Sequence, residues 1–464
     1  MKRLSKNLLA IILSDVTRRV LGFLAVAYLA RKVGTAGFGA VNIGLTVLSY
    51  AMMVSTAGLN SFGTRAVARG NSGDIVPGTL SLRGVNALAA WFIVLVIALF
   101  FVQNRTSATL IAMFSISLFA HALLLDWYFQ GKEEMGIIGL GRIVSAATYL
   151  LMLILFVRSA SDILWVAAGT VAGDFLNAGL LVGAYRRRQG PLRLHADLAR
   201  WKSMMKQAFP LGSGSILAHL SVNLPTLVIG IVMTNTDVGM YNAASKLVFF
   251  LLVFDRVFAT LLLPASARLY AKSSEALMAT LSTALKWIVV IALPLSLGGT
   301  FLSNGMLEFV FGNQYLQAAP VFRILIWYFF FTMIHTVFTT GLIAVGQENV
   351  YGKVMVISAV LFGVSIILLT EFFGIVGTAI AVVGSEAVTL VLMRRQFLRF
   401  VELPLPPSLF RTVVAASVMG LALFLLPPAH VLVSILVGGC IYVLATFALR
   451  TVTVDEVSQL LRRV

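Results

Sequence analysis

Long apolar runs constrain this chain more than any other feature. Runs of about 17 to 25 residues, the length that crosses about 30 Å of hydrocarbon, recur from one end to the other. Hydrophobic residues make up 59% of the 464 residues and charged residues 11%, whereas about a quarter are charged in soluble domains. The sequence therefore predicts an all-α integral membrane protein without a soluble enzymatic domain.

Glycines, prolines and charged clusters bound these runs and predict about fourteen transmembrane helices. The first run follows a basic leader, but no small-residue cleavage site comes after it, so we expect it to be retained. The spans, numbered one to fourteen, are expected near residues 7–31, 38–62, 84–103, 107–129, 137–157, 162–185, 207–233, 238–263, 284–302, 319–345, 351–370, 374–393, 411–427 and 430–449.

Basic residues are distributed unevenly between the two sides of the membrane. Most lysines and arginines fall on the side of the amino terminus, whereas the other side holds Arg31, Lys32, Arg105 and Arg158. The positive-inside rule then predicts cytoplasmic termini. The net charge of +17 reflects this topology and attraction to anionic lipids, and we expect no nucleic-acid partner.

The chain repeats itself. Gly39 and Asn42 match Gly239 and Asn242 at an offset of 200 residues. Three further matches follow in the same order: Gly131-Lys132-Glu133 with Gly346-Gln347-Glu348, Gly141-Arg142 with Gly352-Lys353, and Asp174 with Glu386. The repeat predicts two pseudo-symmetric six-helix lobes of equal orientation around a central cavity, plus two carboxyl-terminal helices.

These lobes define the expected domains. Between them, Leu194, Leu198, Trp201 and Met205 recur at helical spacing among basic residues, which predicts an amphipathic helix on the membrane surface. The expected domains are an N-lobe (1–188), a basic linker (189–206), a C-lobe (207–400), and spans thirteen and fourteen with a cytoplasmic tail (401–464).

Several stretches are similar to a known family. They are VTRRVLGFLAVAYLARKVGTAGFGAVNIG in the first two spans, DWYFQGKEEMG after span four, DVGMYNAASKLVFF in span eight, LLLPASARLYA after it, and FVFGNQYLQAAPVFRIL before span ten. Over about residues 7 to 400, the chain resembles bacterial polysaccharide biosynthesis flippases. These are the O-antigen and exopolysaccharide exporters of the multidrug/oligosaccharidyl-lipid/polysaccharide (MOP) superfamily.

This resemblance implies a flippase for an undecaprenyl-diphosphate-linked oligosaccharide. Such a protein moves its substrate from the cytoplasmic to the periplasmic leaflet by alternating access, with spans one, two, seven and eight lining the cavity. Membrane lipids and polysaccharide polymerase or assembly proteins are its candidate partners. The alternatives are a lipid II flippase, since fourteen spans are shared with that group, and a multidrug cation exporter.

Motifs of enzymes are missing from the sequence. There is no HExxH, no GxSxG, no paired carboxylate motif and no metal-ligand spacing. The single cysteine, Cys440, excludes an intrachain disulfide. We therefore expect a protein that is not an enzyme and has no metal or cofactor, apart from a coupling H⁺ or Na⁺.

Span one carries three ionisable residues, Asp15, Arg18 and Arg19. They separate apolar stretches of 7 and 11 residues, and neither reaches the roughly 20 residues that cross a membrane. Asp15 has the spacing to pair with either arginine, which leaves one positive charge. Since guanidinium groups bind phosphate oxygens as a fork, we expect Arg18 and Arg19 to bind the diphosphate. The alternatives are that residues 1–19 lie on the membrane surface, or that the arginines pair with another helix.

The repeat supplies further candidates for substrate binding. The offset of 200 residues maps Arg19 onto His219 in span seven, which is titratable near neutral pH or a packing residue. Lys246 follows Asn242 by four residues on one face of span eight. We expect these three residues and Asn42 to face the cavity.

Other charged residues have less certain roles. Arg31 and Lys32 depart from the positive-inside rule, and Arg31 is a candidate contact for the diphosphate on the periplasmic side; a solvated helix end is the alternative. Asp255 points to the opposite side of the helix from Lys246, and Asp255 and Arg256 suit lobe packing or a cytoplasmic gate.

Two acids and two histidines are candidates for ion coupling. Asp174 and Glu386 lie in the last helix of each lobe, and either bind a coupling H⁺ or Na⁺ or are protonated and packed. His121 and His335 fall at similar depths in spans four and ten, and the same two readings apply to them.

Overall fold

The computed structural model describes residues 2–70, 75–192, 197–403, 406, 408–426, 430–453 and 456. Within these ranges, the side chains of residues 2–16, 211 and 213–221 are outside the description. The described residues form α-helices and two short 3₁₀ helices, with no strand among them, which confirms the all-α prediction. The chain divides into two compact units, Met1–Gly239 and Met240–Val464.

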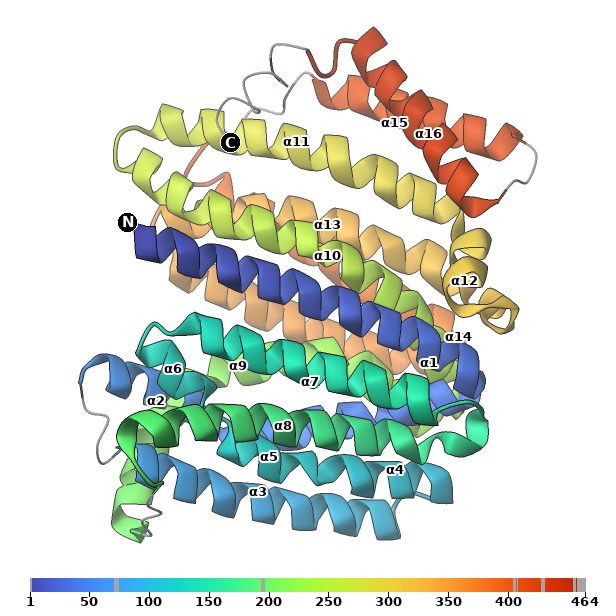
Figure 1. Ribbon diagram of the computed structural model, residues 1–464. Helices are drawn as coiled ribbons and strands as arrows, with labels where there is room; N and C mark the ends of the chain where they lie inside the picture. The colour runs from blue at the N-terminus through green and yellow to red at the C-terminus, as the bar shows by residue number, and fades with distance from the viewer. Residues whose placement is uncertain are drawn as a thin grey trace. The chain divides into compact units, whose positions relative to one another are not determined.

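The N-terminal unit is a bundle of membrane-length helices and shorter pieces. Within it, α4 and α5 pack between α3 and α8, and α7 lies beside α8 (Figure 1). Its elements are α1 (Lys2–Thr56), α2 (Leu59–Ala68), α3 (Ile75–Phe100), α4 (Arg105–Ser115), α5 (Ser117–Leu123), α6 (Asp126–Gly131), α7 (Met135–Phe156), η1 (Ala160–Asp162), α8 (Leu164–Gln189), α9 (Leu198–Val232) and the start of α10 (Asn235–Tyr270).

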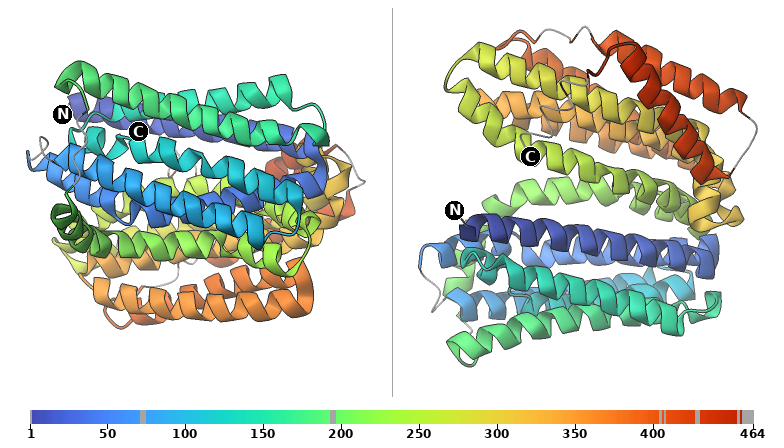
Figure 2. Two further views of the ribbon diagram at one scale, coloured as in Figure 1. Left: turned by 90° about the horizontal axis from the view of Figure 1, so that it is seen from below. Right: turned by 45° about the horizontal axis from the view of Figure 1, so that its top comes forward.

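The C-terminal unit contains the rest of α10 and the helices that follow. Its last two helices pack on each other and against α11, as the right view of Figure 2 shows in red. The further elements are α11 (Ser274–Phe301), α12 (Ser303–Phe311), η2 (Asn313–Ala318), α13 (Ala319–Ala344), α14 (Glu348–Phe397), α15 (Ser408–Leu425) and α16 (Val431–Ala448).

Eleven helical stretches in the described part of the chain are long and apolar enough to cross a membrane. Thr17–Thr56 and Glu348–Phe397 each hold two of the expected spans. Within expected span seven, the described part of α9 contains the shorter apolar stretch Val222–Val232. The eleven stretches are therefore compatible with fourteen spans, and the chain is a multi-pass membrane protein.

Two glycines reverse the longest helices. As one straight helix, the 55 residues of α1 would be about 80 Å long, but Gly34 has a φ of 74° and α1 turns back before α2 (Figure 1). In α14, Gly374 has a φ of 61°, and the hydroxyls of Thr370, before it, and Thr378, after it, lie 2.8 Å apart. Glycine adopts such angles without steric cost.

The aromatic motif after span four is a packing element. Trp127, Tyr128 and Phe129 on α6 are nearly inaccessible to solvent and form a core cluster with residues of α2, α3, α7 and α8. Gly63 on α2 lies against the indole ring, since a Cβ atom there would be 2.4 Å from Trp127 Cε3. The motif thus anchors α6 among four other helices.

The start of each repeat meets its own copy. A Cβ atom on Gly39 would lie 1.7 Å from the carbonyl oxygen of Asn235, and a Cβ atom on Gly239 would lie 2.0 Å from that of Thr35. Thr35 and Asn235, like Gly39 and Gly239, are 200 residues apart. The contact is therefore reciprocal, as in an interface with two-fold symmetry, and it supports the internal repeat.

The turn after span four also recurs after span ten. In each turn a backbone N–H bonds to the carbonyl five residues earlier, at 2.8 Å for Glu134 and 2.9 Å for Gln347. The preceding residue has a positive φ, 58° at Glu133 and 76° at Gly346, which is the Schellman geometry of a helix end. These turns align Glu133 with Gly346, whereas the sequence match aligns Gly131 with Gly346. The two alignments differ by two residues.

Substitution of Gly39 by alanine tests the reciprocal contact. Because the new methyl group would overlap backbone atoms, α1 and α10 must separate, and such overpacking costs about 1 to 3 kcal/mol. We expect Gly39→Ala to lower the melting temperature of the purified protein by several degrees.

The control is Gly22→Ala on the same helix, where a Cβ atom meets nothing within 4 Å and alanine favours the helix by up to about 1 kcal/mol. A Gly39→Ala protein as stable as the Gly22→Ala protein would contradict the close approach.

Candidate functional site

Arg18 and Arg19 lie on the first half of α1, within the stretch expected as span one. Both side chains are half-buried, and the helix continues through them without interruption up to Gly34. Asp15 lies on the same helix, but its side chain is outside the described residues. The structure thus places two adjacent guanidinium groups on an apolar membrane helix.

The two repeat-related asparagines are buried alike. Asn42 is 4% exposed and Asn242 5% exposed. The Asn42 amide donates to the carbonyl oxygen of Phe38 at 2.8 Å, and the backbone carbonyl of Asn242 accepts from the Ser245 hydroxyl at 3.1 Å. Their part in substrate binding stays a prediction, and each also has a local packing role.

The other predicted cationic contacts are spread along the chain. Lys246 is half-buried on α10, one turn after Asn242, and no described side chain of the C-terminal unit forms an ion pair with it. Arg31 is exposed near the end of the first half of α1, and the ammonium of its neighbour Lys32 lies 5.8 Å from the centre of the Tyr28 ring. His219 lies on α9, but its side chain is outside the described residues.

The N-terminal unit contains a histidine–carboxylate pair. Nε2 of His121 on α5 lies 3.3 Å from Oδ2 of Asp174 on α8, and the two side chains are 26% and 16% exposed. The pair joins expected spans four and six. Each of the two groups thus gives the other a polar partner in an apolar environment.

The C-terminal unit contains the matching pair. Nδ1 of His335 on α13 lies 3.0 Å from Oε1 of Glu386 on α14, and the side chains are 14% and 15% exposed. Asp255 on α10 accepts a hydrogen bond from the Thr336 hydroxyl and interacts electrostatically with both members of the pair. Tyr328 lies near the two carboxylates, so four titratable groups share this site.

The two pairs occupy equivalent positions in the repeat. His335 follows His121 by 214 residues and Glu386 follows Asp174 by 212, close to the spacing that the Schellman turns set. The sequence indicates the depth of each residue, but only the structure joins them. Each unit therefore contains a histidine–carboxylate pair among its described residues.

Arg83 is a buried cation that the sequence analysis placed in the loop before span three. The structure places it inside α3, 3% exposed, where its guanidinium donates to the carbonyl oxygens of Leu124, at 2.8 Å, and of His121. These carbonyls end α5, where the helix breaks before α6. A hydropathy window cannot detect such a cation, because its partners are backbone atoms of another span.

Comparison with known proteins shows the family of this chain. A family model described as "Polysaccharide biosynthesis protein" matches residues 4–270, more than half of the chain. A putative O-antigen transporter from Escherichia coli (strain K12) is 22% identical over 411 residues, which cover 84% of this chain and 95% of that protein.

Two solved structures share the fold. Lipid II flippase MurJ in an inward closed conformation has a TM-score of 0.72 at 15% identity, over 94% of this chain and 97% of that one. An inward-facing multidrug resistance MATE family transporter of the MOP superfamily has a TM-score of 0.67 at 12% identity, over 82% and 94%. The resemblance deduced from the sequence is confirmed: the chain has the MOP fold and belongs to the polysaccharide biosynthesis protein family.

Proposed function

We propose that this protein is a flippase that moves an undecaprenyl-diphosphate-linked oligosaccharide, an O-antigen or exopolysaccharide unit, from the cytoplasmic to the periplasmic leaflet. It acts as a transporter by alternating access and is not an enzyme. In a chain of this family and fold, the observation that carries the proposal is the pair of half-buried arginines, Arg18 and Arg19, on an apolar membrane helix.

Energetics favours a functional role for these arginines. An arginine in the middle of a membrane helix costs about 2.5 to 3.5 kcal/mol on insertion scales, and two adjacent ones are retained here. A diphosphate carries the charge that offsets this cost, and guanidinium groups bind its oxygens in bidentate fashion. A cationic drug would instead need an acidic site, which argues against a multidrug exporter.

The distribution of charge supports the proposed direction of transport. Arg65, Arg69, Arg186, Arg187 and Arg188 lie at helix ends on the side assigned to the cytoplasm. A lipid-linked sugar that is made on the cytoplasmic side has its diphosphate next to these arginines. The protein then moves this lipid from the cytoplasmic to the periplasmic leaflet.

We further propose that the histidine–carboxylate pairs bind the coupling ion, and that this ion is a proton. Imidazole titrates near neutral pH, and the C-terminal pair is surrounded by Asp255 of α10 and Tyr328 of α13. Helix α11 also packs on α13, but its Lys286 forms an ion pair with Glu456 at 2.6 Å. Protonation of His335 and Glu386 thus changes the charge between α13 and α14.

The second candidate is a lipid II flippase, which the structural similarity to MurJ favours. Both functions need the same cationic chemistry, so the sugar distinguishes them. Complementation of a strain depleted of its lipid II flippase separates the two functions, and we expect no rescue.

Removal of the span-one arginines tests the mechanism. We expect Arg18→Ala/Arg19→Ala to reduce surface polysaccharide at least ten-fold and to raise the lipid-linked precursor, because each charge-assisted hydrogen bond contributes about 1.5 to 3 kcal/mol. Both quantities are measured in cells with protein abundance matched by immunoblot.

Arg105→Ala is the control, since Arg105 is exposed at the first turn of α4 and its loss should leave export unchanged. Wild-type export by the double variant at normal abundance would refute the cationic mechanism.

Neutralisation of Glu386 tests proton coupling. In proteoliposomes with an imposed pH gradient, we expect Glu386→Gln to slow lipid turnover at least ten-fold and to abolish its dependence on the gradient. Glutamine keeps a polar partner for His335 but cannot exchange a proton.

The matched control is Glu371→Gln, an exposed glutamate on the same helix, which should retain both rate and gradient dependence. If Glu386→Gln still responds to the gradient as the wild type does, the pair is structural.

A further inference from the structure

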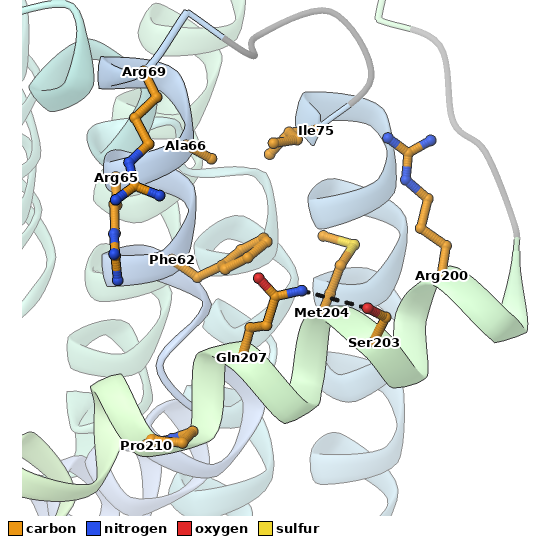
Figure 3. A pocket seen from close by; sticks show the side chains of 10 residues that line it. All are labelled: Phe62, Arg65, Ala66, Arg69, Ile75, Arg200, Ser203, Met204, Gln207 and Pro210. Carbon is orange, nitrogen blue, oxygen red and sulfur yellow. Dashed lines mark hydrogen bonds between the residues drawn. The ribbon is translucent and has the colours of Figure 1, made fainter.

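A cavity lined by arginines opens where α2, the start of α3 and the beginning of α9 meet in the N-terminal unit (Figure 3). Its volume is about 600 Å³, within the range of about 300 to 1,000 Å³ that small-molecule sites occupy. It involves neither the span-one arginines nor the histidine–carboxylate pairs.

Three guanidinium groups border this cavity from two sides. Arg65 in the last turn of α2 and Arg69, the residue that caps this helix, are four residues apart and exposed. Arg200 comes from the first turn of α9, on the other side in Figure 3. No carboxylate is among the described residues that line it. Like charges around one space create a positive potential that favours an anion, and the guanidinium fork matches phosphate.

The walls between the arginines are apolar. The Phe62 ring projects between α2 and α9 in Figure 3, while Ile75 comes from the start of α3 and Met204 from α9. Met204 is 4% exposed and belongs to a buried cluster with Leu59, Leu82 and Ala208. The cavity thus combines charges for a phosphoryl group with an apolar surface for the chain that carries it.

Backbone packing holds the two sides in place. A Cβ atom on Gly58, just before α2, would lie 2.1 Å from the carbonyl oxygen of Ala208, and one on Gly212 would lie 2.6 Å from Gly58 Cα. Gly58 also has a φ of 83°. Because α2 and α9 touch through backbone atoms here, the two helices that carry the arginines keep their spacing when a ligand binds, which lowers the entropic cost of binding.

The first turns of α9 have the character of an interfacial helix. Leu198 is 82% exposed and Phe209 57% exposed, while Lys202 and Lys206 are exposed between them. Long basic side chains beside exposed apolar ones suit the boundary between hydrocarbon and headgroups, where the ammonium groups reach toward the phosphates. A ligand in the adjacent cavity would meet lipid phosphates at that boundary.

We propose that this cavity binds the phosphoryl headgroup of an anionic lipid. The shared chemistry is one or two phosphate groups attached to an apolar chain, supplied either by a bilayer phospholipid or by the diphosphate of a lipid-linked sugar. The second source rests on the proposed function, in which the site would receive the headgroup before translocation. Binding of a bilayer phospholipid does not depend on the proposed function.

Binding to the full-length protein in detergent micelles tests the proposal. The two probes are undecaprenyl diphosphate and phosphatidylglycerol, titrated separately and followed by native mass spectrometry. We expect Arg65→Gln/Arg69→Gln to weaken binding of the preferred probe at least ten-fold. The matched control, Lys202→Gln/Lys206→Gln, removes the same charge from exposed residues of α9 outside the cavity and should change affinity less than three-fold.

A steric variant separates a defined site from diffuse attraction. Ala66 lines the cavity, and Ala66→Trp should fill it without changing any charge and should also weaken binding at least ten-fold. Equal losses in the arginine and lysine pairs, unchanged binding by Ala66→Trp, or no binding of either probe would each overturn the proposal. Identical elution of all variants in gel filtration shows that they are folded.

The two probes identify the source of the phosphate. Preference for undecaprenyl diphosphate supports a docking site for the transported class of lipid, whereas equal or tighter binding of phosphatidylglycerol supports a phospholipid site. If Arg18→Ala/Arg19→Ala exports normally while the cavity still binds lipid, the proposed function fails and the cavity stands. If export fails in that variant but the cavity binds nothing, the cavity proposal alone is wrong.

Discussion

Polar groups inside a membrane must find their partners within the protein, and the rest of this structure depends on that constraint. Within a helix, the backbone groups bond to one another. Other partners are needed only where a helix breaks or where a charged side chain lies inside the membrane. Arg83 supplies donors to the carbonyls at the end of α5, and His121 and His335 each meet a carboxylate. The histidine–carboxylate pairs, which satisfy this constraint, are also the groups that we propose for proton coupling.

Much of the architecture could be predicted from the sequence, because hydropathy and glycine positions record it directly. The spans, the all-α class and the repeat between Gly39 and Gly239 follow from local patterns, and the family follows from ordered motifs. The sequence also places Asp174 and Glu386 at equivalent depths. It could not pair them with His121 and His335, since that pairing depends on how α8 and α14 rotate against α5 and α13.

Side-chain neighbours from distant segments were beyond sequence reasoning. Hydropathy assigned Arg83 to a loop, because a cation at the edge of an apolar run has the same hydropathy whether its partner is water or the carbonyl groups at the end of another helix. Arg65 and Arg69 come from one expected loop and Arg200 from another, so their common cavity depends on the contact between Gly58 and Gly212. Each glycine is ordinary in the sequence, and its importance becomes visible only when the opposing backbone is known.

The reciprocal contact of Thr35–Gly39 with Asn235–Gly239 has a consequence for how the chain can evolve. A segment that packs against its own copy is selected twice, once for its own helix and once as the surface that the copy meets. A larger side chain accepted at one glycine reduces the space left for the other, so the two copies cannot drift independently at this crossing. Sequence divergence between the halves of such a protein should therefore be slowest where the repeat touches itself.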